Sequence, residues 1–174
     1  MSVRLLLDVG LGDHFGSGAD SSFEWMLRIA ASFCHLWLVR HVRLVVEWDQ
    51  QSRVVHPGQA GERQINDALA RLEPQKNEGG RGAGSSTGRP AGQPPPSALE
   101  IVITTHAAVL RWTTPQGGIC RRIILVLGCG REQASPPVLA RSDAICVPLD
   151  LSRDVAEQLR SYGSKLGHDA WAAV

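Results

Sequence analysis

A single carboxylate at the end of an apolar run is the feature that most constrains how this chain folds. Asp8 closes a mostly apolar run over residues 3–7 and is followed by the sequence Val-Gly-Leu-Gly. An apolar run that ends in a glycine-rich loop is typical of a buried strand in an α/β sheet. Open α/β sheets bind their ligands at the carboxyl ends of the strands. We therefore expect Asp8 to lie where such a sheet places a ligand site.

Length and composition favour one globular domain that spans residues 1–174. The 174 residues are 43% hydrophobic and 20% charged, which is enough for one sizeable core. The formal net charge is +1 and no basic stripe is interleaved with aromatic residues, so we expect no nucleic-acid partner. The four cysteines show neither metal-ligand nor redox spacing, so we expect reduced thiols and a cytoplasmic protein.

The sequence also argues against a membrane span. Its longest apolar stretch, residues 29–46, is interrupted by two histidines and two arginines, and no signal-peptide pattern opens the chain. A different composition marks residues 75–97, where alanine is the only apolar residue type among Gly, Pro, Ser, Gln and Arg. Such a segment buries too little apolar surface to offset its ordering entropy. We predict a disordered low-complexity insertion there.

Helical patterns occupy three segments of the chain. Ser21 and Glu24 form a capping box before a helix that we expect to reach residue 41. This helix has so little polar surface that we expect both of its sides to be covered. An amphipathic pattern predicts a second helix over residues 62–73, and Ser152 is the expected cap of a last helix that ends at Lys165.

Strand patterns alternate with these helices. Alternation of this kind predicts an α/β fold in which a mostly parallel sheet lies between two helical layers. The expected strands, rich in β-branched and aliphatic residues, cover residues 3–7, 43–48, 52–56, 98–105, 123–127 and 144–148, with a short helical turn over residues 107–112.

The order of these segments resembles one bacterial family. A strand ending in Asp8, a glycine-rich loop, a long apolar helix that opens at residues 21–25, two short strands, and the segments 67–72 and 101–105 follow one another as in the von Willebrand factor A-like "domain of unknown function 58" proteins. The resemblance covers nearly the whole chain apart from the insertion. It implies a von Willebrand factor A-like, Rossmann-type three-layer sandwich with a mostly parallel central sheet.

The resemblance also implies a degenerate metal-ion-dependent adhesion site. Von Willebrand factor A-type domains hold magnesium with the motif Asp-x-Ser-x-Ser, and Asp8 matches its carboxylate, whereas Gly10 and Gly12 stand at the two serine positions. His106 stands where the family pattern often has an acidic residue after threonine. Magnesium requires near-octahedral oxygen ligation. We therefore expect neither a metal nor another cofactor, and no catalytic residues.

The function implied by the resemblance is that of a non-catalytic interaction or assembly module. Family members are often found beside MoxR-type AAA+ ATPases, so a MoxR-type ATPase is the expected protein partner. The loop after the first strand keeps His14 and Phe15, which we expect to be available for contact. Trp112 and Trp171 lie outside the strongest core segments, and they fit either an interface or a capping role.

Two enzyme interpretations use the same residues. A metal-dependent hydrolase would draw on Asp8, His14 and His106, with Cys129 close to the same edge of the sheet, but no helix-borne histidine pair supports it. A nucleotide-binding enzyme would use the loop over residues 10–16 as a phosphate loop. Several aspartates crowd this loop, which disfavours an anion there.

Overall fold

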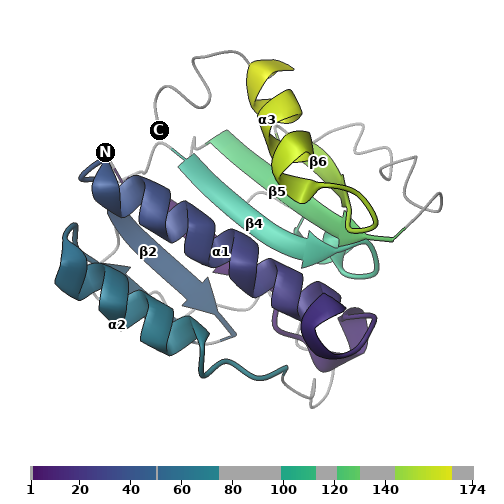
Figure 1. Ribbon diagram of the computed structural model, residues 1–174, viewed down its shortest axis with the longest axis horizontal. Helices are drawn as coiled ribbons and strands as arrows, with labels where there is room; N and C mark the ends of the chain where they lie inside the picture. The colour runs from purple at the N-terminus through teal and green to yellow at the C-terminus, as the bar shows by residue number, and fades with distance from the viewer. Residues whose placement is uncertain (1, 50, 75–98, 113–120, 130–143, 166–174) are drawn as a thin grey trace.

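The computed structural model describes residues 2–49, 51–74, 99–112, 121–129 and 144–165 (Figure 1). Strands and helices alternate along the described chain, as the sequence patterns predict. In order, the elements are β1 (Ser2–Leu7), η1 (Leu11–Asp13), η2 (Gly18–Asp20), α1 (Ser22–Val39), β2 (Arg43–Trp48), β3 (Gln51–Val55), α2 (Gln59–Leu69), β4 (Leu99–Thr105), η3 (Val109–Trp112), β5 (Arg121–Gly128), β6 (Ala144–Asp150) and α3 (Val155–Lys165). The predicted insertion lies outside the described residues.

The six strands form one sheet in the order β3-β2-β1-β4-β5-β6. Every neighbouring pair is parallel except β2 and β3, which are antiparallel, so the predicted mostly parallel α/β sheet is confirmed. The chain direction across the sheet reverses between β1 and β4, which makes this pair the topological switch point of a Rossmann-like sheet. Asp8 directly follows β1, and its backbone N–H donates to the carbonyl of Ile103 in β4 at 3.1 Å.

All three described α-helices lie over one face of the sheet (Figure 1). The core on that face includes Leu5 of β1, Ile101 of β4, Trp37 of α1 and Ile65 of α2, all of them buried. Burial of such side chains stabilises a fold by about 1.5–3 kcal/mol each. Alternation of side chains along the strands sends every second residue to the opposite face.

The expected helical layer on the second face is not formed by the described residues. That face is contacted by η3, where Val109 packs with Leu6, Val102 and Ile124 in a smaller apolar cluster. The crossover from β4 to β5 begins on this face, as right-handedness requires for strands that advance across the sheet in the opposite direction from β1 and β2. The described part of that crossover contains a short 3-10 helix where the sandwich would place an α-helix.

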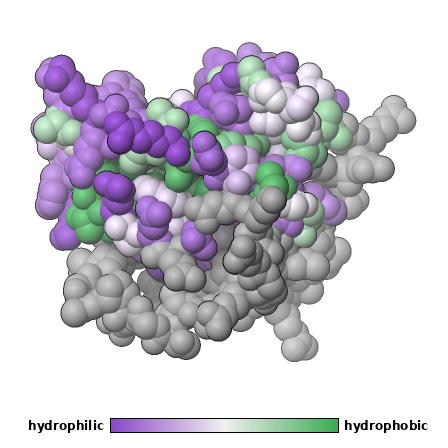
Figure 2. Space-filling view, turned by 90° about the horizontal axis from the view of Figure 1, so that it is seen from below, coloured by the Kyte–Doolittle hydropathy of each residue, from purple (hydrophilic) through white to green (hydrophobic). Residues whose placement is uncertain are grey.

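Helix α1 also differs from expectation on its outer side. Leu36 and Val39 are 37% and 60% exposed, so the prediction that both sides of this helix are covered is wrong. The described surface in the view of Figure 2 is mostly hydrophilic, with apolar residues scattered in small groups. Apolar side chains that are exposed one by one are normal on a protein surface.

Local hydrogen bonds explain where the helices start. The capping box is confirmed in its first half, since the Ser21 hydroxyl accepts from the Glu24 N–H at 3.2 Å. The predicted cap of α3 is wrong: Asp154 accepts from the N–H of Glu157 at 2.9 Å. The Ser152 hydroxyl donates instead to the preceding carboxylate at the end of β6. Helix α2 begins earlier and ends earlier than its apolar pattern suggests.

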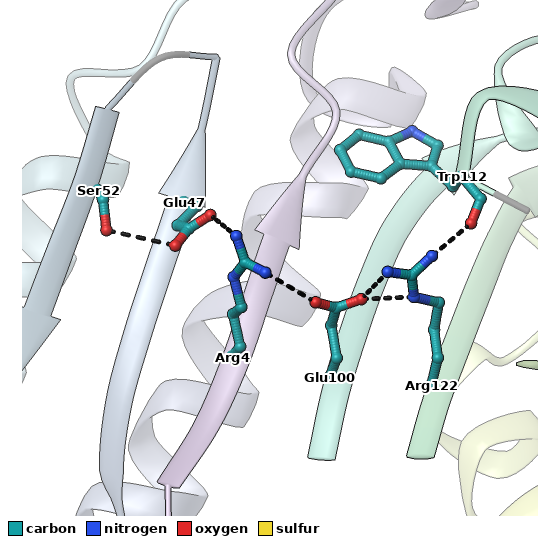
Figure 3. A network of polar contacts seen from close by, with 6 residues as sticks. All are labelled: Arg4, Glu47, Ser52, Glu100, Trp112 and Arg122. Atoms are coloured by element: carbon teal, nitrogen blue, oxygen red, sulfur yellow. Dashed lines mark hydrogen bonds and ion pairs between the residues drawn. The ribbon is translucent and has the colours of Figure 1, made fainter. Parts of the chain in front are cut away.

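The second face of the sheet carries a row of alternating charges, which we call the charge ladder: Glu47 of β2, Arg4 of β1, Glu100 of β4 and Arg122 of β5 (Figure 3). Arg4 donates to Glu47 at 2.6 Å and to Glu100 at 3.0 Å. Arg122 pairs with the other oxygen of Glu100. The Glu100 side chain is only 3% exposed. The sequence patterns did not predict this ladder, because its residues are brought together only by strand pairing.

The ion pairs of the charge ladder offset the free-energy cost of burying its charged side chains. Removing a carboxylate from water costs several kcal/mol, and its attraction to close, hydrogen-bonded cations must offset that cost. Burial alone would lower the pKa of Arg4, but its hydrogen bonds with Glu47 and the negative charges of Glu47 and Glu100 raise the pKa above its ordinary value.

We predict that Glu100→Gln lowers the free energy of unfolding by about 3–5 kcal/mol, because it leaves two partly buried guanidinium groups without their shared carboxylate. Glu47→Gln is the matched control, since Glu47 is 22% exposed and Arg4 keeps its contact with Glu100. The control should cost about 1 kcal/mol or less. Urea denaturation of both variants measures the difference. Equal losses would contradict a special role for Glu100.

Candidate functional site

The candidate site lies at the carboxyl ends of β1 and β4, where Asp8 leaves the sheet. Asp8 is 7% exposed. Its Oδ2 accepts from the Thr104 hydroxyl at 2.8 Å and from the indole N–H of Trp112 at 3.0 Å. Its Oδ1 lies 3.4 Å from the backbone N of Gly10. Donors from three separate segments thus converge on this carboxylate.

Trp112 occupies the space in front of the carboxylate because η3 crosses the second face of the sheet. Its backbone carbonyl accepts from Arg122 of the charge ladder at 2.9 Å (Figure 3). Because its indole N–H donates to Asp8, this residue contacts both groups. A cation at Asp8 would have to displace two donors from Oδ2, and each displaced donor in a buried position costs about 1–3 kcal/mol. The arrangement therefore disfavours a metal ion at this carboxylate.

The two glycines of the predicted site are not demanded by their backbone conformations. Gly10 has a φ of −64°, which any residue adopts. A Cβ built on Gly12 would meet nothing within 4 Å, and Gly12 is not among the glycines with positive φ. Glycine at these positions removes the side-chain oxygens that a serine would supply, and at Gly12 neither the backbone nor the surrounding space requires it.

His106 follows β4 at the same edge and is exposed. Its backbone N–H donates to the carbonyl of Leu127 at 3.3 Å, which anchors the turn after β4. Cys129 is an exposed free thiol after β5. In the described segments, no group of three or more His, Cys, Asp or Glu side chains is placed to hold a metal ion.

His14, which we expected to be available for contact, points into the protein. Its Nε2 lies 2.7 Å from the carbonyl oxygen of Asp8, which can only accept, so Nε2 carries the proton. Its Nδ1 then accepts from the Ser22 hydroxyl at 3.1 Å. The ring also meets Phe23 edge-on at 5.1 Å between centroids. His14 thus fastens the loop to the start of α1, and Phe15 donates its N–H to the same hydroxyl at 2.9 Å.

The Ser22–His14 contact has the composition of a nucleophile and its base. Ser22 is fully buried, however, and its oxygen already accepts a backbone hydrogen bond. A substrate carbonyl has no route to this hydroxyl in the folded protein. The pair therefore holds the loop against the start of α1.

A hollow of about 550 Å³ lies elsewhere, between the β2–β3 hairpin and the end of α2. Its lining includes Trp48, Arg53, Asp67, Arg71 and Glu73, and none of the residues around Asp8. The guanidinium of Arg53 lies over the ring of Trp48, 5.8 Å from its centroid. Both signs of charge line the hollow, so it does not favour an anionic or a cationic ligand.

Two residues of the site, Thr104 and Trp112, were not identified as partners of Asp8 from the sequence. Side-chain alternation from Leu99 could have placed Thr104 on the same face as Asp8, once β1 and β4 were known to be neighbours. Nothing in the sequence indicated the contact of Trp112, because the path of η3 over the sheet is a tertiary feature.

Comparison with known proteins does not identify the chain. No protein-family model matches this sequence, and a search of curated proteins gives no match. Within the described residues, none of the helices is both long enough and apolar enough to cross a membrane.

We predict that Asp8→Ala lowers the free energy of unfolding by about 2–3 kcal/mol, because it leaves the Thr104 hydroxyl and the Trp112 indole N–H without their acceptor. Asp8→Asn keeps one side-chain oxygen as an acceptor and should cost less. Millimolar magnesium should leave the melting temperature of the unmodified protein unchanged, since only a ligand that binds the native state raises it. A magnesium-dependent rise that Asp8→Ala abolishes would contradict this account.

We predict that His14 makes the free energy of unfolding depend on pH. Its burial lowers the pKa of the imidazole, and this outweighs the opposing effects of its hydrogen bond to the Asp8 carbonyl and of the nearby charges of Asp8 and Asp13. The unfolded chain therefore binds more protons below its own pKa of about 6.5, and stability falls as pH decreases from that value towards the folded pKa. His14→Gln should flatten this dependence between pH 7 and pH 5, whatever its cost at pH 7.

Chemical denaturation at several pH values measures this slope. His106→Gln is the matched control, because His106 is exposed and lies outside both the loop that His14 fastens and the β3 edge. It should leave the slope unchanged. The same slope in the His14→Gln variant as in the unmodified protein would show that another group causes it.

Proposed function

We propose that this protein is a non-catalytic interaction module with a von Willebrand factor A-like fold and a degenerate metal site. The proposal depends on the hydrogen bonds of Asp8. Both of its carboxylate oxygens accept from donors within the protein: Thr104, Trp112 and the backbone N–H of Gly10. A carboxylate held in this way is a structural element of the sheet edge. The edge remains a rigid base for loops, and loops on a rigid scaffold are where binding concentrates.

The sheet supports the family resemblance at the level of topology. A mostly parallel sheet with an aspartate directly after the strand β1 is the arrangement that the resemblance leads us to expect. On the same resemblance, we propose a MoxR-type AAA+ ATPase as the partner. The free thiols of Cys34 and Cys146 support a cytoplasmic setting.

The contact surface that we propose is the exposed tip formed by η1 and the turn after β4. Leu11 in η1 is 44% exposed, and Gly12 and His106 are exposed near the same sheet edge. His14 holds this loop from beneath through its contacts with Asp8 and Ser22. Because the loop is fixed at its base, its exposed leucine can contact a partner with little loss of loop conformational entropy on binding.

We predict that a MoxR-type ATPase encoded next to this gene is retained by the immobilised protein, and that Leu11→Glu reduces the retention at least tenfold. A tenfold loss corresponds to about 1.4 kcal/mol, which is a modest value for a buried apolar contact replaced by a charge. Leu36→Glu is the matched control, since Leu36 is 37% exposed on α1 and lies outside the proposed surface. Circular dichroism should show that both variants are folded.

Three results would contradict the proposal in different ways. Absence of the ATPase from the unmodified protein would exclude the partner. Equal retention by the Leu11→Glu variant would exclude the surface. A hydrolytic activity that Asp8→Ala abolishes without unfolding the protein would favour the enzyme interpretation.

A further inference from the structure

The outer edge of β3 is an unpaired strand edge in the described part of the chain. β3 is the last strand of the sheet and pairs only with β2 there. An edge strand presents backbone N–H and C=O groups that another strand can bind. The chemistry of such an edge selects an extended backbone as its partner.

The register of the hairpin shows which backbone groups face outward. Trp48 and Gln51 are the last pair before the turn, and in a two-residue hairpin this closing pair exchanges hydrogen bonds. Bonded and non-bonded pairs then alternate along the strands. The N–H and C=O groups of Ser52 and Val54 therefore point away from β2, towards the open edge.

The side chains of β3 restrict what can pair there. Val54 is 42% exposed, whereas the other exposed positions of β3 are polar. Arg53 is exposed on the opposite face, where its guanidinium lies over Trp48. Asp67 and Arg71 line the same hollow as Arg53, so the surface beside the edge carries both signs of charge. A surface with both signs is compatible with a second copy of itself.

We propose that β3 pairs antiparallel with β3 of a second copy of this chain, around a two-fold axis at Val54, so that the two sheets become continuous. In this register the two Val54 residues form a hydrogen-bonded pair, and Ser52 lies opposite His56 of the second copy. The outward backbone groups of Ser52 and Val54 are all paired. The Val54 side chains bury their exposed surface against each other.

The charge of Arg53 favours a two-fold axis at Val54 over an axis at Arg53. A two-fold axis at Arg53 would also pair the outward groups, but it would place the two Arg53 side chains directly opposite each other. Like charges directly opposite in a sheet are destabilising. With the axis at Val54, Arg53 lies opposite the apolar side chain of Val55 of the second copy, and the two guanidinium groups are on separate strand positions.

Cross-linking tests the register. Hydrogen-bonded antiparallel pairs have Cα atoms about 5.5 Å apart, which is within the range of a disulfide. In a Cys129→Ser background, Val54→Cys should form a disulfide-linked dimer under mild oxidation. Ser52→Cys is the matched control, because its two copies would lie about 13 Å apart and cannot be bridged. Mass spectrometry of tryptic peptides identifies which cysteines are joined.

Sedimentation velocity tests the dimer itself with the full chain. The unmodified protein should sediment at twice the monomer mass, Val54→Ile should remain dimeric, and Val54→Lys should be monomeric because it places two ammonium groups together at the axis. A monomer at every soluble concentration would overturn the proposal. A dimer that persists in Val54→Lys, or a Ser52→Cys link as efficient as that of Val54→Cys, would also overturn it.

Discussion

The geometry of the sheet depends on one buried carboxylate, Glu100, held between two arginines on neighbouring strands. Arg4, Glu100 and Arg122 are direct register partners across β1, β4 and β5, so a shift of any of these strands by one residue would turn a charge into the apolar core. An uncompensated buried charge costs several kcal/mol. The same register brings Thr104 beside Asp8 at the carboxyl end, and the charge ladder therefore also sets the geometry of the candidate site.

Trp112 connects the ladder to the site. Its carbonyl accepts from Arg122 while its indole N–H donates to Asp8, so one residue of η3 contacts both groups of polar side chains. The two groups share the second face of the sheet, where the described chain provides no α-helix. Polar residues on this face are stabilised by one another, whereas the opposite face is stabilised by apolar packing against α1, α2 and α3. This division explains why the carboxylate of Asp8 is satisfied within the protein.

The proposed partner surface and the proposed dimer edge are different parts of the molecule. The first is formed by η1 and the turn after β4, near the switch point of the sheet, and the second is the outer edge of β3. A dimer joined at β3 would leave both copies of the Leu11 surface exposed. Two copies of a contact surface in one assembly increase the effective concentration of the second contact once the first is made. The two proposals are thus compatible, and the variants at Leu11 and Val54 test them separately.

The sequence by itself determined the elements that local physics controls: the strand before Asp8, the two strands β2 and β3, and the capped start of α1 at Ser21. Apolar periodicity and capping depend only on neighbouring residues, so these features can be predicted from the sequence. The tertiary structure decided the rest. The Asp8 carboxylate accepts hydrogen bonds from Thr104 and Trp112, which are about a hundred residues away in sequence. His14 faces inward because the Asp8 carbonyl offers it an acceptor and the Ser22 hydroxyl offers it a donor. Partners brought together by strand order leave no periodic signal along the chain.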